Sequence, residues 1–222
     1  MAISRAKLGS NSDFLAWLQA NAVPNIFASV SMRGDGSTVQ ALDDDGNVVF
    51  LMQSGQFVAY VDDNVQKTYS NGYQLITSSG DDKWSDIIGC DNGFILEAKT
   101  GVDKRYLLVL MCAKTNNGKV AVVFASGDTS SRTTVLRSSI HHIARGDNPS
   151  LETTTSFSTE SAAQTVLTPF ATNANIGDVS YTPDAFYMPM HSAYSAGLGK
   201  FSLGSDIFIT NGYWAIRDGG GA

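Results

Sequence analysis

Short runs of alternating apolar and polar residues, each ended by a turn signal, limit most strongly how this chain can fold. Residues 26–32 alternate before Arg33-Gly34-Asp35-Gly36, and Val39 and Ala41 continue the period of two before the acidic stretch 43–47. Such alternation places one face of a β-strand toward a core, and Gly, Asp and Asn favour turns. The same pattern predicts further strands at residues 48–52, 57–61, 65–69 and 73–77.

Two hairpins carry the clearest turn signals. Residues 106–114 and 119–125 flank Asn116-Asn117-Gly118, and residues 206–210 and 213–217 flank Asn211-Gly212. Asn-Gly favours a tight hairpin turn because both residues tolerate positive φ. The strands of the first hairpin are nearly all apolar, so we expect both of their faces to be covered. Residues 87–88 and 94–96 flank a similar turn, and together these strands predict a mainly β, antiparallel sandwich or barrel-like body.

One short amphipathic helix is predicted near the start of the chain. Asn11 or Ser12 can cap it, Asp13 complements its dipole, and Asn21 and Pro24 end it. A helix of about ten residues is not stable alone, so its apolar stripe must dock on the same chain or on a neighbour. The stripe consists of Phe14, Leu15, Trp17 and Leu18.

Composition divides the chain into four segments. Residues 1–24 form an N-terminal arm with the short helix, and residues 25–145 form the antiparallel β domain. Residues 146–165, rich in Ser and Thr, are expected to be an arm or linker. Residues 166–222 form an aromatic-rich segment that ends in the second hairpin.

The charge balance disfavours nucleic acid as a partner. Charged residues make up only 16% of the chain and the net charge is −6, whereas phosphate binding needs clustered Lys and Arg. No apolar run is long enough for a signal peptide or a membrane span, so we expect synthesis in a cytosol without membrane insertion. Cys90 and Cys112 lie in or beside apolar runs, which favours two buried thiols over a disulfide.

No motif in the sequence predicts an enzyme, a cofactor or a metal centre. His141 and His142 are adjacent, so on a strand they occupy opposite faces and do not share a metal easily. The alternate spacing of Asp43, Asp45 and Asn47 is similar to that of a calcium loop, but the glycine position favours a hairpin turn.

Two further patterns have a functional and a structural interpretation. Arg-Gly-Asp occurs at residues 33–35 and 145–147. The tripeptide could bind an adhesion receptor, but we favour the interpretation that both copies simply form turns, because Gly and Asp are common turn residues. Paired carboxylates at Asp81 and Asp82, with Asp86 nearby, could serve a glycosidase, but adjacent turn aspartates favour a solvated loop.

The aromatic residues of the C-terminal segment could pack between subunits or stack on sugars. Tyr and Trp are enriched at protein interfaces, and exposed rings also bind carbohydrate. We favour subunit packing over a sugar site.

Both ends of the chain resemble small virion proteins of tailed bacteriophages. The resemblance rests on residues 1–9, which precede the short helix, and on residues 198–218, which include the last hairpin. It implies a non-enzymatic structural subunit of the head, neck, tail or baseplate, located in the virion and partnered by further copies of itself and by other virion proteins. The alternative is a carbohydrate-binding module of a tail tip, whose partner is a host-surface glycan. The residues expected at subunit interfaces are Phe14, Leu15, Trp17, Leu18, Tyr187, Tyr194, Phe208, Tyr213 and Trp214.

Overall fold

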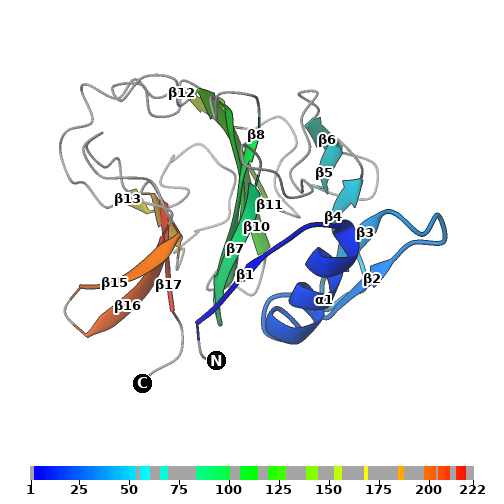
Figure 1. The fold of residues 1–222 in the computed structure, drawn as a ribbon, viewed down its shortest axis with the longest axis horizontal. Helices are drawn as coiled ribbons and strands as arrows, with labels where there is room; N and C mark the ends of the chain where they lie inside the picture. The colour runs from blue at the N-terminus through cyan, green and yellow to red at the C-terminus, as the bar shows by residue number, and fades with distance from the viewer. Residues whose placement is uncertain are drawn as a thin grey trace.

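A computed structural model gives the fold as three antiparallel sheets and one helix (Figure 1). It describes residues 3–53, 56–60, 66–69, 84–100, 106–114, 120–128, 139–144, 153–156, 168–169, 185–187, 198–203, 205–210 and 214–218. The expected mainly β fold with one short N-terminal helix is confirmed.

A seven-stranded sheet, in the order β1-β7-β8-β9-β10-β11-β12, forms the middle layer. Its strands are β1 (Ser4–Lys7), β7 (Trp84–Cys90), β8 (Gly93–Thr100), β9 (Tyr106–Lys114), β10 (Val120–Asp128), β11 (Ser139–Ala144) and β12 (Thr153–Ser156). This central sheet takes strands from three of the four segments that composition suggested. That division into segments stays a prediction.

A five-stranded sheet lies on either side of the central sheet, so the molecule has the stacked layers of a sandwich (Figure 1). On one side, next to the helix α1 (Asn11–Asn21), lie β2 (Ser29–Met32), β3 (Val39–Leu42), β4 (Val48–Gln53), β5 (Gln56–Tyr60) and β6 (Gln66–Tyr69) in chain order. The other side holds the C-terminal sheet, in the order β13-β14-β17-β16-β15. Its strands are β13 (Thr168–Pro169), β14 (Ala185–Tyr187), β15 (Gly199–Leu203), β16 (Asp206–Thr210) and β17 (Trp214–Arg217).

Helix α1 begins one residue earlier than the expected caps allow. Ser10 is the N-cap, because its side chain accepts a hydrogen bond from the backbone N–H of Asp13 at 3.1 Å. Asp13 returns the contact, since its carboxylate accepts from the backbone N–H of Gly9 at 3.0 Å. The prediction of Asn11 or Ser12 as cap was therefore wrong by one or two positions, while the helix itself and its end at Asn21 are confirmed.

Aromatic rings fill the space between α1, the sheet β2–β6 and the central sheet. Phe14 of the helix lies 6.3 Å from the ring of Phe50 in β4 and 6.1 Å from the ring of Phe94 in β8. Trp17 contacts Phe94 edge-on at 5.8 Å, and Phe27 contacts Phe50 at 5.5 Å. Edge-to-face and offset contacts of this kind add to the free energy gained by burying apolar area. The helix is thus held by its own chain, one of the two docking partners that the sequence left open.

The predicted strand pairs are confirmed wherever they fall on described residues. β9 pairs with β10 from Tyr106↔Asp128 to Lys114↔Val120, and β16 pairs with β17. The predicted strand at 73–77 and the Asn-Gly turns of both hairpins lie outside the described residues. Strand β1, which the sequence did not predict, pairs antiparallel with β7 from Ser4↔Gly89 to Lys7↔Asp86.

Candidate functional site

A buried pair of carboxylates lies between the central sheet and the C-terminal sheet. Asp86 of β7 and Glu97 of β8 are cross-strand partners, and 8% of Asp86 and 0% of Glu97 is exposed to solvent. Directly opposite residues have their Cβ atoms about 4.5–5.5 Å apart, so the two acidic groups are neighbours. Lys7 of β1 continues the same row on the other side of Asp86 and is exposed.

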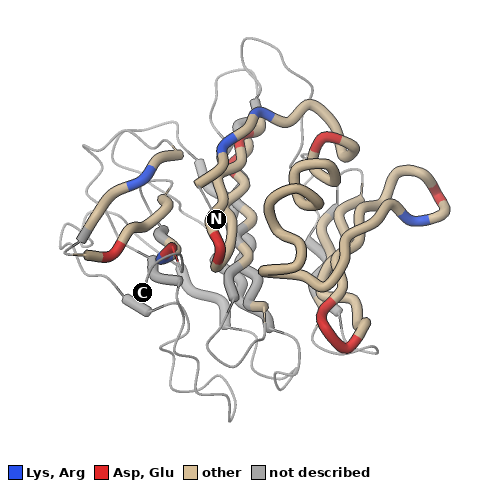
Figure 2. Tube along the Cα trace, turned by 90° about the horizontal axis from the view of Figure 1, so that it is seen from below, with Lys and Arg blue, Asp and Glu red and all other residues tan. Residues whose placement is uncertain are grey.

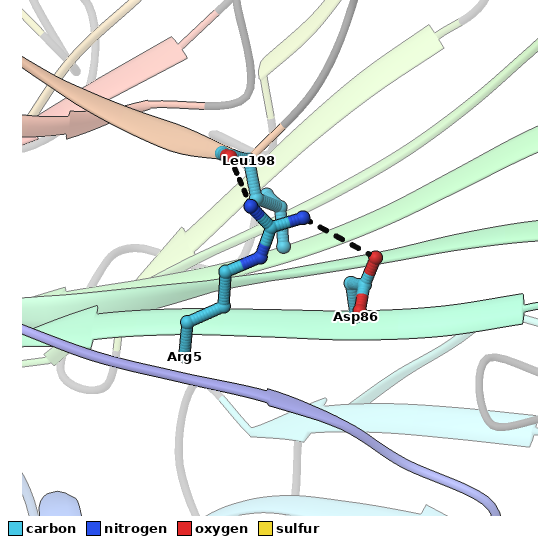
Figure 3. A network of polar contacts seen from close by, with 3 residues as sticks. All are labelled: Arg5, Asp86 and Leu198. Carbon is cyan, nitrogen blue, oxygen red and sulfur yellow. Dashed lines mark hydrogen bonds and ion pairs between the residues drawn. The ribbon is translucent and has the colours of Figure 1, made fainter.

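Arg5 links this carboxylate pair to the C-terminal sheet (Figure 3). One guanidinium nitrogen donates a hydrogen bond to the carbonyl oxygen of Leu198, just before β15, at 2.8 Å. Another guanidinium nitrogen lies 3.6 Å from a carboxylate oxygen of Asp86. A single side chain of the first strand thus contacts both the central sheet and the C-terminal layer.

The turn between β7 and β8 makes a second connection between the layers. Asn92 donates to the carbonyl oxygen of Arg217 at 3.1 Å, and the Cys90 thiol lies 3.8 Å from the same oxygen. On the other side of the central sheet, Asn25 donates to Asp91 at 3.3 Å. Consecutive residues of one turn therefore contact both flanking layers.

Both cysteines are buried free thiols, as the sequence predicted. Burial raises the pKa of the Cys90 thiol to about 12, and the nearby Asp218 carboxylate adds to the rise. Burial also raises the pKa of Cys112 well above its usual value. Because the thiolate is the reactive form, neither thiol is poised for nucleophilic chemistry.

Of the three carboxylates that the glycosidase alternative named, only Asp86 lies among the described residues, so that alternative stays a prediction. The two acids of a glycosidase flank a glycosidic bond and must be reached by a sugar. Glu97 is fully buried within the layers, and Asp81 and Asp82 lie outside the described residues. The sequence pointed to Asp86 but missed Glu97, whose signal is a single acidic residue inside the apolar run of β8.

The first Arg-Gly-Asp stretch is the turn between β2 and β3, which Figure 2 shows at the outer end of that hairpin. One carboxylate oxygen of Asp35 accepts from the backbone N–H groups of Ser37 and Thr38 at 2.9 and 2.8 Å, and the other accepts from the Thr38 hydroxyl. These hydrogen bonds, the hydroxyl contact first, lower the pKa of Asp35 to about 2. The carboxylate is engaged within its own loop, which supports turn chemistry rather than adhesion. The second stretch, residues 145–147, lies outside the described residues.

The acidic stretch 43–47 is a hairpin turn, as the sequence favoured. One carboxylate oxygen of Asp43 accepts from the backbone N–H groups of Asp45 and Asn47 at 3.1 and 2.7 Å, and the other accepts from the Asn47 amide at 3.2 Å. Gly46 has a positive φ of 81°, a conformation that glycine adopts without strain. The Asp43 oxygens thus hold the turn together through the hydrogen bonds that a calcium ligand would have to give up.

Three of the four helix residues expected at a subunit interface lie in the chain's own core. Phe14 and Leu18 are fully buried and Trp17 is 6% exposed, so these side chains pack within the core of their own chain. Leu15 is only partly buried against the same core. Of these four side chains, Leu15 has the largest exposed fraction.

The C-terminal interface residues have mixed placements. Phe208 of β16 is 3% exposed and stacks on Phe201 of β15 with ring centroids 5.0 Å apart. Tyr187 and Trp214 are cross-strand partners in β14 and β17. Tyr194 and Tyr213 lie outside the described residues.

Strand β15 forms an edge of the C-terminal sheet within the described part of the chain. β15 pairs with β16 on one side, and no described strand pairs with its other side. Ser202 of β15 and its partner Ile207 of β16 are exposed. Among the residues whose side chains are described, Ile207, at 40%, is the one exposed large apolar residue. An unpaired strand edge offers backbone N–H and C=O groups to another strand.

Three further observations concern metal ligands, the histidines and membrane spans. Across the described ranges, no group of three or more His, Cys, Asp or Glu residues is placed to hold a metal ion. His141 and His142 occupy successive positions of β11, in register with Phe124 and Val123 of β10. No helix in the described part of the chain is long and apolar enough to cross a membrane.

Comparisons of the chain with protein-family models, with curated proteins and with solved structures returned no match.

Proposed function

We propose that the chain is a non-enzymatic structural subunit of a bacteriophage particle, where it works by assembling in many copies in the tail, the baseplate or a capsid-associated position. The resemblance to virion proteins rests on residues 1–9 and 198–218. In the fold these two stretches meet where the Arg5 guanidinium donates a hydrogen bond to the carbonyl oxygen of Leu198. The two ends that resemble virion proteins therefore form one connected part of the molecule.

The observation that carries the proposal is the outer edge of β15, with which no described strand pairs, and the exposed Ile207 beside it. A strand of a neighbouring copy could extend the C-terminal sheet there through main-chain hydrogen bonds and cover the Ile207 side chain. The low content of charged residues, 16%, supports contacts between identical surfaces, because fewer charges must be desolvated. Interfaces between identical subunits are commonly closed and cyclic.

Sedimentation velocity of the purified full chain and two charge variants tests this proposal. Ile207→Glu places a carboxylate beside the open edge, and we expect it to shift the assembled species toward the monomer. Gln19→Glu adds the same charge on the exposed side of α1 and is the matched control, which we expect to assemble like the unmodified chain. Equal assembly of all three proteins would show that the β15 edge is not the contact.

A carbohydrate-binding result would replace this proposal rather than refine it. A chain that stays monomeric and binds a glycan array, with binding lost in Trp84→Ala or Trp214→Ala, would identify a sugar-binding module. A chain that assembles and binds no glycan supports the structural subunit.

A further inference from the structure

The hydrogen bonds of the C-terminal sheet show which main-chain groups of β15 face its outer edge. The N–H of Asp218 donates to the carbonyl oxygen of Ile207 at 2.7 Å, so the main chain of Ile207 faces away from β15. Ile207 and its cross-strand partner Ser202 are therefore a non-hydrogen-bonded pair. Such pairs alternate with hydrogen-bonded ones, so Lys200, two residues along, is in the same position. Ser202 and Lys200 thus direct their N–H and C=O groups to the outer edge of β15, with which no described strand pairs.

The side chains beside these outward groups are accessible. Lys200 and Ser202 are two residues apart on one face of the sheet, and both are exposed. Ile207 lies opposite Ser202 on the same face and is 40% exposed. A strand that pairs with this edge therefore meets one cation, one hydroxyl group and one uncovered apolar side chain.

Strand β1, an edge of the central sheet, has a surface of the opposite kind. The N–H of Leu8 donates to the carbonyl oxygen of Ser85 at 2.9 Å, so the main chain of Leu8 faces β7. By the same alternation, Arg5 and Lys7 direct their main-chain groups to the outer edge of β1. Both side chains are exposed cations. Pairing of two β1 strands about Ala6 would place Arg5 opposite Lys7, and like charges directly opposite oppose such pairing.

We propose that β15 of one copy pairs antiparallel with β15 of a second copy about a two-fold axis at Phe201, so that the two C-terminal sheets become one continuous sheet. This inference rests on the proposed function, because it names one of the contacts by which the copies assemble. In this register Lys200 of each copy lies opposite Ser202 of the other. Every outward N–H of these two residues then meets an outward C=O of the second copy. A surface that pairs with itself about a two-fold axis is the commonest form of subunit contact.

The side chains fit this register. The residue opposite Lys200 is a serine, so no charged side chain of β15 faces a like charge. In the row across the joined sheet, Ile207 is followed by Ser202 and then by Lys200 of the second copy. The aliphatic stem of that lysine would lie over the serine toward Ile207 and cover part of its exposed surface, with the ammonium group still in water.

Two substitutions at Ser202 test the register, because they act in opposite directions. Ser202→Glu places a carboxylate opposite Lys200 of the second copy. The axis repeats this pair, so we expect the dissociation constant of the dimer to fall about 2- to 30-fold. Ser202→Lys places like charges opposite each other and should raise the constant by a similar factor. Sedimentation equilibrium of the full chain over a range of concentrations measures the dissociation constant.

The net charge of the chain predicts the reverse order for these variants. Each copy carries a charge of −6, so an added carboxylate increases the repulsion between copies and an added lysine reduces it. Gln19→Glu and Gln19→Lys, on the exposed side of α1, report this general effect alone and are the matched controls. We expect only the Ser202 variants to follow the cross-strand pairing, with a difference that shrinks as salt is added.

Hydrogen exchange of the unmodified chain gives a second measurement that needs no variant. The outward N–H groups of Lys200 and Ser202 should exchange slowly in the assembled chain and fast after dilution. The outward N–H groups of Arg5 and Lys7 should exchange fast in both samples.

Two results would overturn the β15 contact while assembly of the chain still held. One is an order of the Ser202 variants that follows net charge or shows no difference. The other is fast exchange at Lys200 and Ser202 in the assembled chain. A chain that stays monomeric at every concentration would overturn both this contact and the proposed function.

Discussion

Replacing Gly89 with alanine should destabilise the chain by about 3 kcal/mol, the upper end of the usual cost of overpacking a core. A methyl group at this position in β7 would overlap Cη2 of Trp17 and lie 2.8 Å from Cζ2 of the same ring. The indole cannot easily move away, because it is 6% exposed and packs edge-on against Phe94 at 5.8 Å. The free energy of unfolding from urea denaturation measures the cost.

A double-mutant cycle isolates this contact. In a Trp17→Leu background the two ring atoms are gone, and the indole nitrogen has no acceptor in the described part of the chain to lose. Gly89→Ala should then cost less than about 0.5 kcal/mol or even stabilise, because alanine restricts the unfolded chain. Gly199→Ala is the control: a Cβ there meets nothing within 4 Å, so little change is expected. An equal cost of Gly89→Ala in both backgrounds would refute the packing of α1 on β7.

Three further predictions concern polar groups. Arg5→Ala should lower the free energy of unfolding in the same urea assay by about 1 kcal/mol, the typical contribution of one hydrogen bond, because the half-exposed ion pair adds little. Lys7→Ala is the control and should change the free energy of unfolding by less than about 0.5 kcal/mol. By NMR the Asp35 carboxyl should titrate with a pKa of about 2, and in Thr38→Val this pKa should rise toward 3.8. The stability that the ionised carboxylate contributes is fully present above pH 3.8 and is lost as the pH falls through about 2. The Cys90 thiol should resist alkylation near about pH 8 until the chain is unfolded, and reaction of the folded chain at the rate of a free thiol would contradict its burial.

The elements that the sequence predicted are those fixed by local signals. The capping serine of the helix lies four residues before the first residue of its apolar stripe, and each hairpin has its turn residues between two apolar runs. The turns at residues 33–36 and 43–47 follow from Asp and Gly, whose side-chain and backbone preferences act over a few residues.

Strand β1 could not be predicted in this way. Its residues, Ser4–Lys7, are mostly polar or small, and they form a strand because they pair with residues 86–89, far along the chain. The same holds for the stacking of the C-terminal sheet on the central sheet. It depends on contacts such as Arg5 to Leu198 that no local pattern encodes.

The pairing of Asp86 with Glu97 could have been predicted in part from the sequence. The turn between β7 and β8 was recognised, and its tight register pairs Cys90 with Gly93 and so brings Asp86 opposite Glu97. Counting residues outward from that turn would have found the pair. Its burial could not be foreseen, because it depends on the layer that covers this face of the central sheet.

The mass of the purified full chain in solution tests the central claim, assembly in many copies, most directly. Light scattering over a range of concentrations should give a species whose mass is an integral multiple of 23.6 kDa and which persists on dilution. A mass of 23.6 kDa at every concentration, in a chain that also fails to join a particle, would contradict the account.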